Sequence, residues 1–88
     1  MEYDYLKYPR SVVALAGEIN RVVNDYDARK INNDQMSEII LWYANNLPGK
    51  LFKGQDYLNT IKKYCGARRV ELMNTVLREH QAALFKGV

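Results

Sequence analysis

The chain has 88 residues, of which 48% are hydrophobic and 26% charged, and its net charge at pH 7 is +3. These are ordinary globular values, which exclude a disordered chain, and the length leaves room for one domain with one modest core. A single cysteine excludes a disulfide framework, and the longest apolar run, residues 39–44, is far shorter than the roughly 20 residues of a membrane span.

The first eight residues, 1–8, are predicted to form an N-terminal arm. Their tyrosines, Tyr3, Tyr5 and Tyr8, either pack on the domain or act as an exchange surface between subunits. Farther along, apolar residues recur at steps of three and four, which predicts a helix over residues 9–28. Pro9 is compatible with the first turn of this helix, because a backbone N–H at that position would have no partner within the helix.

The start of the next helix, predicted over residues 33–47, carries the clearest local signal in the chain. With Asn32 as the N-cap, Gln35 occupies the third helical position, as in a capping box. We expect the following Pro48-Gly49 pair to end the helix, because neither residue favours its continuation.

The second half opens with residues 48–54, predicted as a loop whose apolar Leu51 and Phe52 fold back on the core. A helix is predicted over residues 55–65, and Gly66 is its expected terminator, because glycine adopts a positive φ without steric cost.

A last helix is predicted over residues 67–85. Together the elements predict an all-α fold, with residues 1–88 forming one compact domain of about four amphipathic helices joined by short turns.

The sequence offers little for catalysis. Cys65 and His80 are the only thiol and the only imidazole, and both lie on predicted inward faces. A nucleophilic pair needs a third, orienting group, and one His with one Cys cannot complete a tetrahedral metal site. No phosphate-binding or nucleophile motif is present either. We therefore expect a protein that is not an enzyme and that uses no cofactor or metal.

Charge is unevenly distributed along the chain. Residues 1–48 hold five Lys or Arg against seven Asp or Glu, a net −2, whereas residues 49–88 hold eight against three, a net +5. Such asymmetry is explained either by solubility alone or by an acidic partner. The candidate residues for binding an anion or a partner are Lys50, Lys53, Lys62, Lys63, Arg68 and Arg69.

Arg68 and Arg69 are the least explained of these residues. They fall in the first turn of the helix predicted to begin at residue 67, where the helix dipole already supplies positive charge. The balancing negative charge comes either from Glu71 in the same turn or from an external phosphate or carboxylate.

The same stretch has the proportions of a helix–turn–helix unit. Ile61, Cys65 and Gly66 fit the expected apolar, apolar and glycine positions. Lys62 does not fit, because the motif places a small buried residue there. The pattern thus favours a tight corner between two helices over a DNA-reading unit.

A resemblance also rests on these residues. The run from Ile61 to Leu77, with its Lys-Lys pair, its glycine and the sequence Arg-Arg-Val-Glu-Leu, resembles small uncharacterised helical proteins of Gram-positive bacteria and their prophages. The similarity extends over most of residues 7–80. It implies a bacterial or phage cytoplasmic accessory protein and transfers no functional residues.

The second candidate surface is apolar. Residues 39–44 are six apolar residues in succession. One face of a helix in a thin domain cannot bury all of them. Either this helix is central and packed on several sides, or Leu41 and Trp42 face a partner and are interface residues. Self-association would also cover the surplus.

These observations lead to two functional hypotheses. The first is a small cytoplasmic interaction or regulatory protein that binds a protein partner or a second copy of itself. The alternative is a nucleic-acid-binding regulator that uses the basic cluster around Gly66. We expect no signal peptide and no membrane partner, because the N-terminus lacks a basic and an apolar region.

Overall fold

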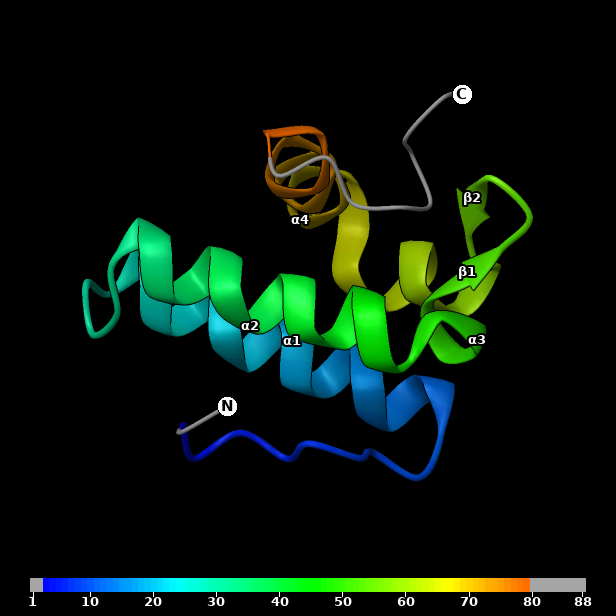
Figure 1. The fold of residues 1–88 in the computed structure, drawn as a ribbon, viewed down its shortest axis with the longest axis horizontal. Coiled ribbons are helices and arrows are strands. Elements are labelled where there is room, and N and C mark those ends of the chain that lie inside the picture. Colours follow the sequence, from blue (N-terminus) through cyan, green and yellow to red (C-terminus); the bar gives the residue numbers. More distant parts are fainter. Residues whose placement is uncertain (1–2, 80–88) are drawn as a thin grey trace.

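The computed structural model describes residues 3–79, and four helices and one small hairpin lie within them (Figure 1). In chain order the elements are α1 (Val12–Asp27), α2 (Asn33–Asn46), α3 (Pro48–Leu51), β1 (Phe52–Lys53), β2 (Asp56–Tyr57) and α4 (Asn59–Glu79). The all-α prediction is confirmed, apart from this hairpin of two short strands.

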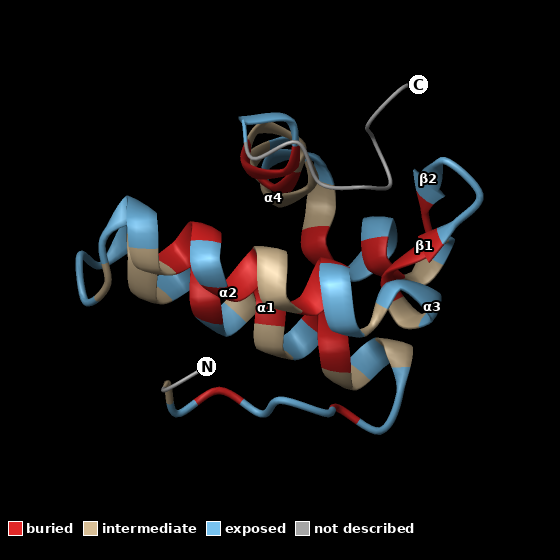
Figure 2. Ribbon diagram, viewed as in Figure 1, coloured by how far each residue is buried: buried red, intermediate tan, exposed pale blue. Residues whose placement is uncertain are grey.

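Helices α1 and α2 form the centre of the fold, because each contacts the other three helices, and the most extensive packing is that of α1 against α4. Figure 1 shows α1 and α2 side by side, with the end of α4 running across them. Figure 2 shows buried positions on α1, α2 and α4, and the buried hydrophobic residues belong to one core cluster. Its largest fully buried members are Tyr43, Leu15, Ile19, Met36, Ile39, Ile40, Leu51, Ile61, Met73, Leu77, Val22 and Val23.

The two first helices begin where a side chain caps them. Helix α1 starts at Val12, because the Ser11 Oγ accepts the Ala14 N–H at 3.0 Å, so the predicted start at Pro9 is wrong. The predicted capping box of α2 is confirmed: the Asn32 side chain accepts from the Gln35 N–H at 2.8 Å, and the reciprocal bond is 2.9 Å.

The segment between α2 and α4 contains more structure than the predicted loop over residues 48–54. Pro48 follows the end of α2 but starts α3, where its missing N–H costs nothing. Phe52 then pairs with Tyr57 in a hairpin whose turn contains Gly54 at φ 63°. The rings of this pair lie 5.2 Å apart. The predicted helix start at residue 55 is therefore wrong, and α4 begins at Asn59.

The predicted break at Gly66 is confirmed. Its φ of 82° and ψ of 166° interrupt α4 and divide it into residues 59–65 and 67–79. Figure 1 shows the two parts running in different directions, which is the corner that the sequence favours. The predicted helix end at residue 85 and His80 lie outside the described residues.

The N-terminal arm is not helical and runs back along α1 and α2 (Figure 1). The structure extends the arm one residue beyond its predicted end, so the name arm is kept below for residues 3–9. Two of these residues are buried: Tyr5, which belongs to the core cluster, and Pro9 (Figure 2). Of the two predicted roles of the arm tyrosines, packing on the domain is the one seen within a single chain.

Candidate functional site

The basic residues around Gly66 are held by α1. Both terminal nitrogens of Arg68 bind the carboxylate of Asp27 in the last turn of α1, at 2.9 and 2.7 Å. The hydrogen bonds from Arg68 favour the ionised carboxylate and lower the pKa of Asp27 below its ordinary value. The negative charge that balances Arg68 therefore comes from inside the chain.

Arg69 is held by neutral groups. Its guanidinium donates to the Asn24 side-chain oxygen at 2.8 Å and to the Cys65 carbonyl at 3.3 Å. On the other side of the corner, the Asn20 amide donates to the Tyr64 carbonyl at 3.0 Å. The polar face of α1 thus forms hydrogen bonds with α4 on both sides of Gly66.

The partner of Arg68 was not among those expected from the sequence. Glu71, the expected internal partner, instead accepts from Arg78 at 3.4 Å. The only signal for the true contact was the polar stripe of Asn20, Asn24 and Asp27, which are spaced four and three residues apart on one helix face.

The four candidate lysines do not join the arginines in one site. Lys62 binds Asp56 at 2.5 Å, and Asp56 is also the hairpin partner of Lys53. Lys63 is exposed, and its ammonium lies 6.0 Å from the centre of the Tyr64 ring. Lys50 is half-buried at α3.

The Lys50 ammonium donates to the Pro9 carbonyl at 2.8 Å, where it fixes the end of the arm. The six basic candidates therefore serve three places: the arm, the hairpin and the corner at Gly66.

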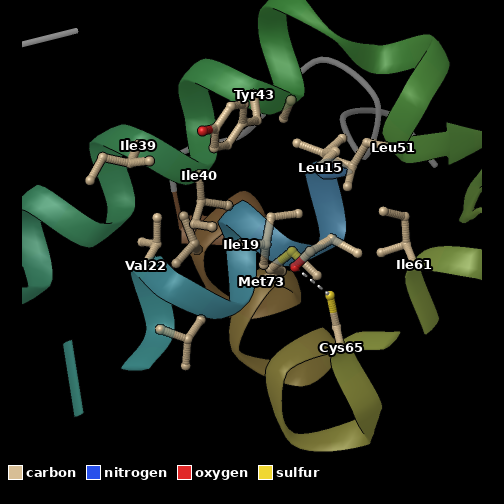
Figure 3. Close-up of a cluster of buried hydrophobic side chains, with 14 of the residues drawn as sticks. Leu15, Ile19, Val22, Ile39, Ile40, Tyr43, Leu51, Ile61, Cys65 and Met73 are labelled. Carbon is tan, nitrogen blue, oxygen red and sulfur yellow. Dashed lines mark hydrogen bonds between the residues drawn. The ribbon is translucent and has the colours of Figure 1, made fainter. Parts of the chain in front are cut away.

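Cys65 is buried, with 2% of its surface exposed. Figure 3 shows its thiol pointing into the cluster that contains Leu15, Ile19 and Met73, and the thiol donates to the Ala16 carbonyl at 3.9 Å. Burial raises the pKa of this thiol to about 11. Such a thiol is a poor nucleophile, because the thiolate is the reactive form. Within residues 3–79 no three His, Cys, Asp or Glu side chains gather as metal ligands.

The apolar surplus of α2 is partly covered by the arm. Leu41 and Trp42 are half-buried and pack against the core. The Tyr8 ring meets Trp42 edge-on with 5.4 Å between ring centres, and the Tyr43 ring meets Trp42 edge-on at 5.7 Å. The helix is therefore packed on several sides, as one of the two alternatives predicts. Trp42 is still not fully covered, and a partner at Leu41 and Trp42 stays a prediction.

The backbone of the arm is held by side chains of the helices. The Leu6 N–H donates to Glu18 at 2.8 Å, and the Leu6 carbonyl accepts from the Tyr43 hydroxyl at 2.6 Å. These two contacts come from α1 and α2 respectively, so both helices hold the same residue of the arm.

The tyrosines of the arm reach carboxylates on the same two helices. The Tyr5 hydroxyl donates to Asp25 at 2.5 Å, and the Tyr3 hydroxyl donates to Glu38 at 2.9 Å. The Arg21 guanidinium lies 5.1 Å from the centre of the Tyr5 ring. Burial, followed by the hydrogen bond to Asp25, raises the pKa of Tyr5 to about 12.

The arm nevertheless leaves apolar side chains in water. Within residues 3–79, four large hydrophobic side chains are exposed, and three of them lie between residues 6 and 13: Leu6 at 53%, Tyr8 at 64% and Val13 at 49%. We call these three residues, together with Trp42, the arm face. The fourth exposed residue, Tyr64, lies beside Gly66.

Comparison with known proteins assigns this chain to a protein family. Neither the curated proteins nor the solved structures contain a significant match to this chain. None of the helices in the described part of the chain is long and apolar enough to cross a membrane. One family model, CLB_0814_fam, described as a conserved hypothetical protein, matches residues 6–78. Because this match covers most of the sequence, the chain belongs to the CLB_0814_fam family of conserved hypothetical proteins.

Proposed function

We propose that this chain is a non-enzymatic, cytoplasmic interaction protein that binds a protein partner through the arm face. The observation that carries the proposal is the gathering of Leu6, Tyr8 and Val13 within one short segment, although all three are large and exposed. Scattered exposed apolar residues are normal, whereas a local concentration of them is typical of interaction sites.

The chemistry of the arm face suits protein contact. Tyrosine and tryptophan contribute most to binding energy at protein interfaces, and Tyr8 and Trp42 already lie edge to edge. The carboxylates that the arm contacts on α1, Glu18 and Asp25, are occupied by Leu6 and Tyr5, so a partner would meet mainly apolar surface here.

The burial of Cys65 supports the non-enzymatic part of the proposal. A nucleophilic role would require a thiolate near neutral pH, whereas the pKa of this thiol is about 11. If the chain has a measurable biological effect, Cys65→Ser is expected to retain it.

Nucleic-acid binding is the second candidate function. The observation that favours it is the half-exposed Tyr64 beside Lys63, since stacking rings and cations together bind single strands. The internal contacts of Arg68 and Arg69 weigh against it, because a phosphate would have to compete with Asp27 and Asn24.

Capture experiments separate the two candidates. The tagged full chain is incubated with lysate of a Gram-positive bacterium, the predicted source, with and without nuclease. We expect specific proteins to be retained after nuclease treatment, to be lost with Tyr8→Ser, and to persist with Tyr64→Ser, which removes a similarly exposed ring elsewhere.

The opposite pattern would overturn the first candidate. Retention that disappears with nuclease, falls steeply with salt and depends on Tyr64 and Lys63 would establish nucleic acid as the partner.

A further inference from the structure

We propose that residues 3–9 exchange between two copies of this chain, so that each arm lies on α1 and α2 of the other copy. The inference rests on the proposed function, because it names a second copy as one partner of the arm region. Three observations carry it: the contacts under the arm, the length of the hinge and the position of the exposed side chains.

The surface beneath the arm recognises one specific segment. It offers a carboxylate to Tyr3 and another to Tyr5, and it binds both the N–H and the carbonyl of Leu6. An extended chain with tyrosines two residues apart satisfies all four contacts. In this sequence Tyr3 and Tyr5 are the one pair of tyrosines two residues apart, so the arm of a second copy is a fully complementary ligand.

The hinge is very short. The Pro9 carbonyl is bound by Lys50, and Ser11 already caps α1, which leaves Arg10 as the only residue between the two anchors. The cap of α1 does not use the arm, so the helix keeps its N-terminal hydrogen bond when the arm leaves. Short hinges favour exchange, because a connection of one residue leaves the arm few ways to fold back on its own helix.

Release of an arm without exchange would be costly. Tyr5 belongs to the core cluster, and its departure would expose both its own ring and the apolar surface beneath it. A reciprocal exchange restores each of these contacts in the partner. The free-energy difference between the single chain and the exchanged dimer then lies in the hinge and in the entropy of association.

The exposed apolar residues lie where two exchanging copies would meet. Tyr8 and Val13 flank the Arg10 hinge on either side, at two and three residues. In an exchanged dimer the two hinges cross between the copies, so side chains next to them become part of the junction. The exposure of Tyr8 and Val13 in the single chain is thereby explained.

Mixed cross-linking tests the exchange directly. One full chain carries Tyr3→Cys and a second carries Glu38→Cys, at positions whose side chains form a 2.9 Å hydrogen bond. The two chains are mixed at high concentration and treated with a short bis-maleimide, with the buried native cysteine replaced by serine in both. The matched control pairs Tyr3→Cys with Asn74→Cys on α4.

We expect the Tyr3–Glu38 pair to give a covalent heterodimer at roughly tenfold higher yield than the control pair, because exchange holds only the first two positions side by side. Equal yields for the two pairs would overturn the exchange. Inserting Gly-Ser-Gly after Arg10 is expected to lower the yield, because a relaxed hinge lets each arm return to its own chain.

The two proposals fail differently. If cross-linking is absent while Tyr8→Ser still abolishes capture of another protein, the exchange is wrong and the proposed function stands. If cross-linking is strong and light scattering shows a dimer that captures nothing else, the second copy is the partner. If Tyr8→Ser changes neither measurement and no dimer forms, both proposals are overturned.

Discussion

The arm and the corner at Gly66 were both singled out by the sequence, yet they use their side chains in opposite ways. At the corner, the two arginines for which the sequence offers Glu71 or an external anion are bound instead by Asp27 and Asn24 of α1. At the arm, the polar groups are satisfied inside the chain, while the apolar Leu6 and Tyr8 remain in water.

The difference shows which sequence features indicate a surface that stays free for binding after the chain has folded. A charged side chain is long and finds an internal partner readily, so a run of basic residues says little about what remains free. A large apolar side chain left exposed has no such substitute, because only another apolar surface can cover it. The arm is therefore the better candidate for contact with other molecules.

Removing the Tyr5 ring is expected to have the largest effect. Tyr5→Ala deletes a buried aromatic side chain and should lower the free energy of unfolding by about 2–4 kcal/mol. The loosened arm should also expose Trp42, the only tryptophan, and shift its emission to longer wavelength. Urea unfolding followed by fluorescence measures both quantities.

Tyr8→Ala is the matched control for this prediction. It removes an exposed ring from the same arm and should change the free energy of unfolding much less. If both variants lose the same stability, the arm is not anchored by Tyr5, and the contrast between its buried and exposed residues fails.

The corner is tested by Gly66→Ala. Alanine at a φ of 82° is strained, although nothing lies within 4 Å of the added carbon, so we expect a loss of about 1–3 kcal/mol from backbone conformation alone. Gly17→Ala is the control, because Gly17 lies inside α1, also with free space around it.

Gly17→Ala should raise stability by roughly 0.5–1 kcal/mol, since alanine favours helix. Thermal unfolding of the two variants therefore gives shifts of opposite sign. Two shifts of the same sign would mean that Gly66 does not hold the conformation on which the corner depends.

The contrast between local and distant information also decides how far the fold could be predicted. The capping box at Asn32 and the break at Gly66 are set by residues next to each other in sequence, and both were predicted correctly. The hairpin around Gly54 was missed because its strands have two residues each, too few for a period to show.

The candidate site was harder to predict for the same reason. Arg68 and Asp27 are 41 residues apart, and only the packing of α1 against α4 brings them together. The sequence identified Arg68 as a charge in need of a partner, which was correct, but the alternatives it offered were Glu71 in the same turn and an external anion. The exposure of Tyr8 likewise depends on how far the arm reaches over α2.

The hydroxyl of Tyr5 is expected to have a smaller effect, and one that depends on pH. Tyr5→Phe removes the hydrogen bond to Asp25, which should cost about 1 kcal/mol at neutral pH. The pKa of Tyr5 is raised by folding from 10.0 to about 12. The neutral hydroxyl is thus favoured in the folded state, and this stabilisation is complete below pH 10.

As pH rises from 10 to about 12, the ionised hydroxyl of Tyr5 should favour release of the arm. The stability difference between the wild type and Tyr5→Phe is therefore expected to shrink over that window. Denaturant unfolding at several pH values measures it. A difference that is constant from pH 7 to 12 would show that Tyr5 is not held by Asp25.

The smallest effect is expected at the ion pair of the corner, because Asp27 and Arg68 are both largely exposed. The pKa of Asp27 is lowered in the folded state by the hydrogen bonds from Arg68. Its contribution is therefore present above the unfolded pKa of about 3.9 and is lost as pH falls through the lower folded value.

Asp27→Asn should accordingly be slightly less stable than the wild type at pH 7, and the two should become equal in acid or at high salt. A double-mutant cycle with Arg68→Gln isolates the pair, because the second substitution should cost nothing once Asp27 is gone. If Asp27→Asn instead makes the chain bind phosphate or single-stranded nucleic acid through the released Arg68, the corner is a masked anion site. The difference between the corner, whose charges are bound internally, and the arm, whose apolar side chains are exposed, would then depend on the charge of Asp27 alone.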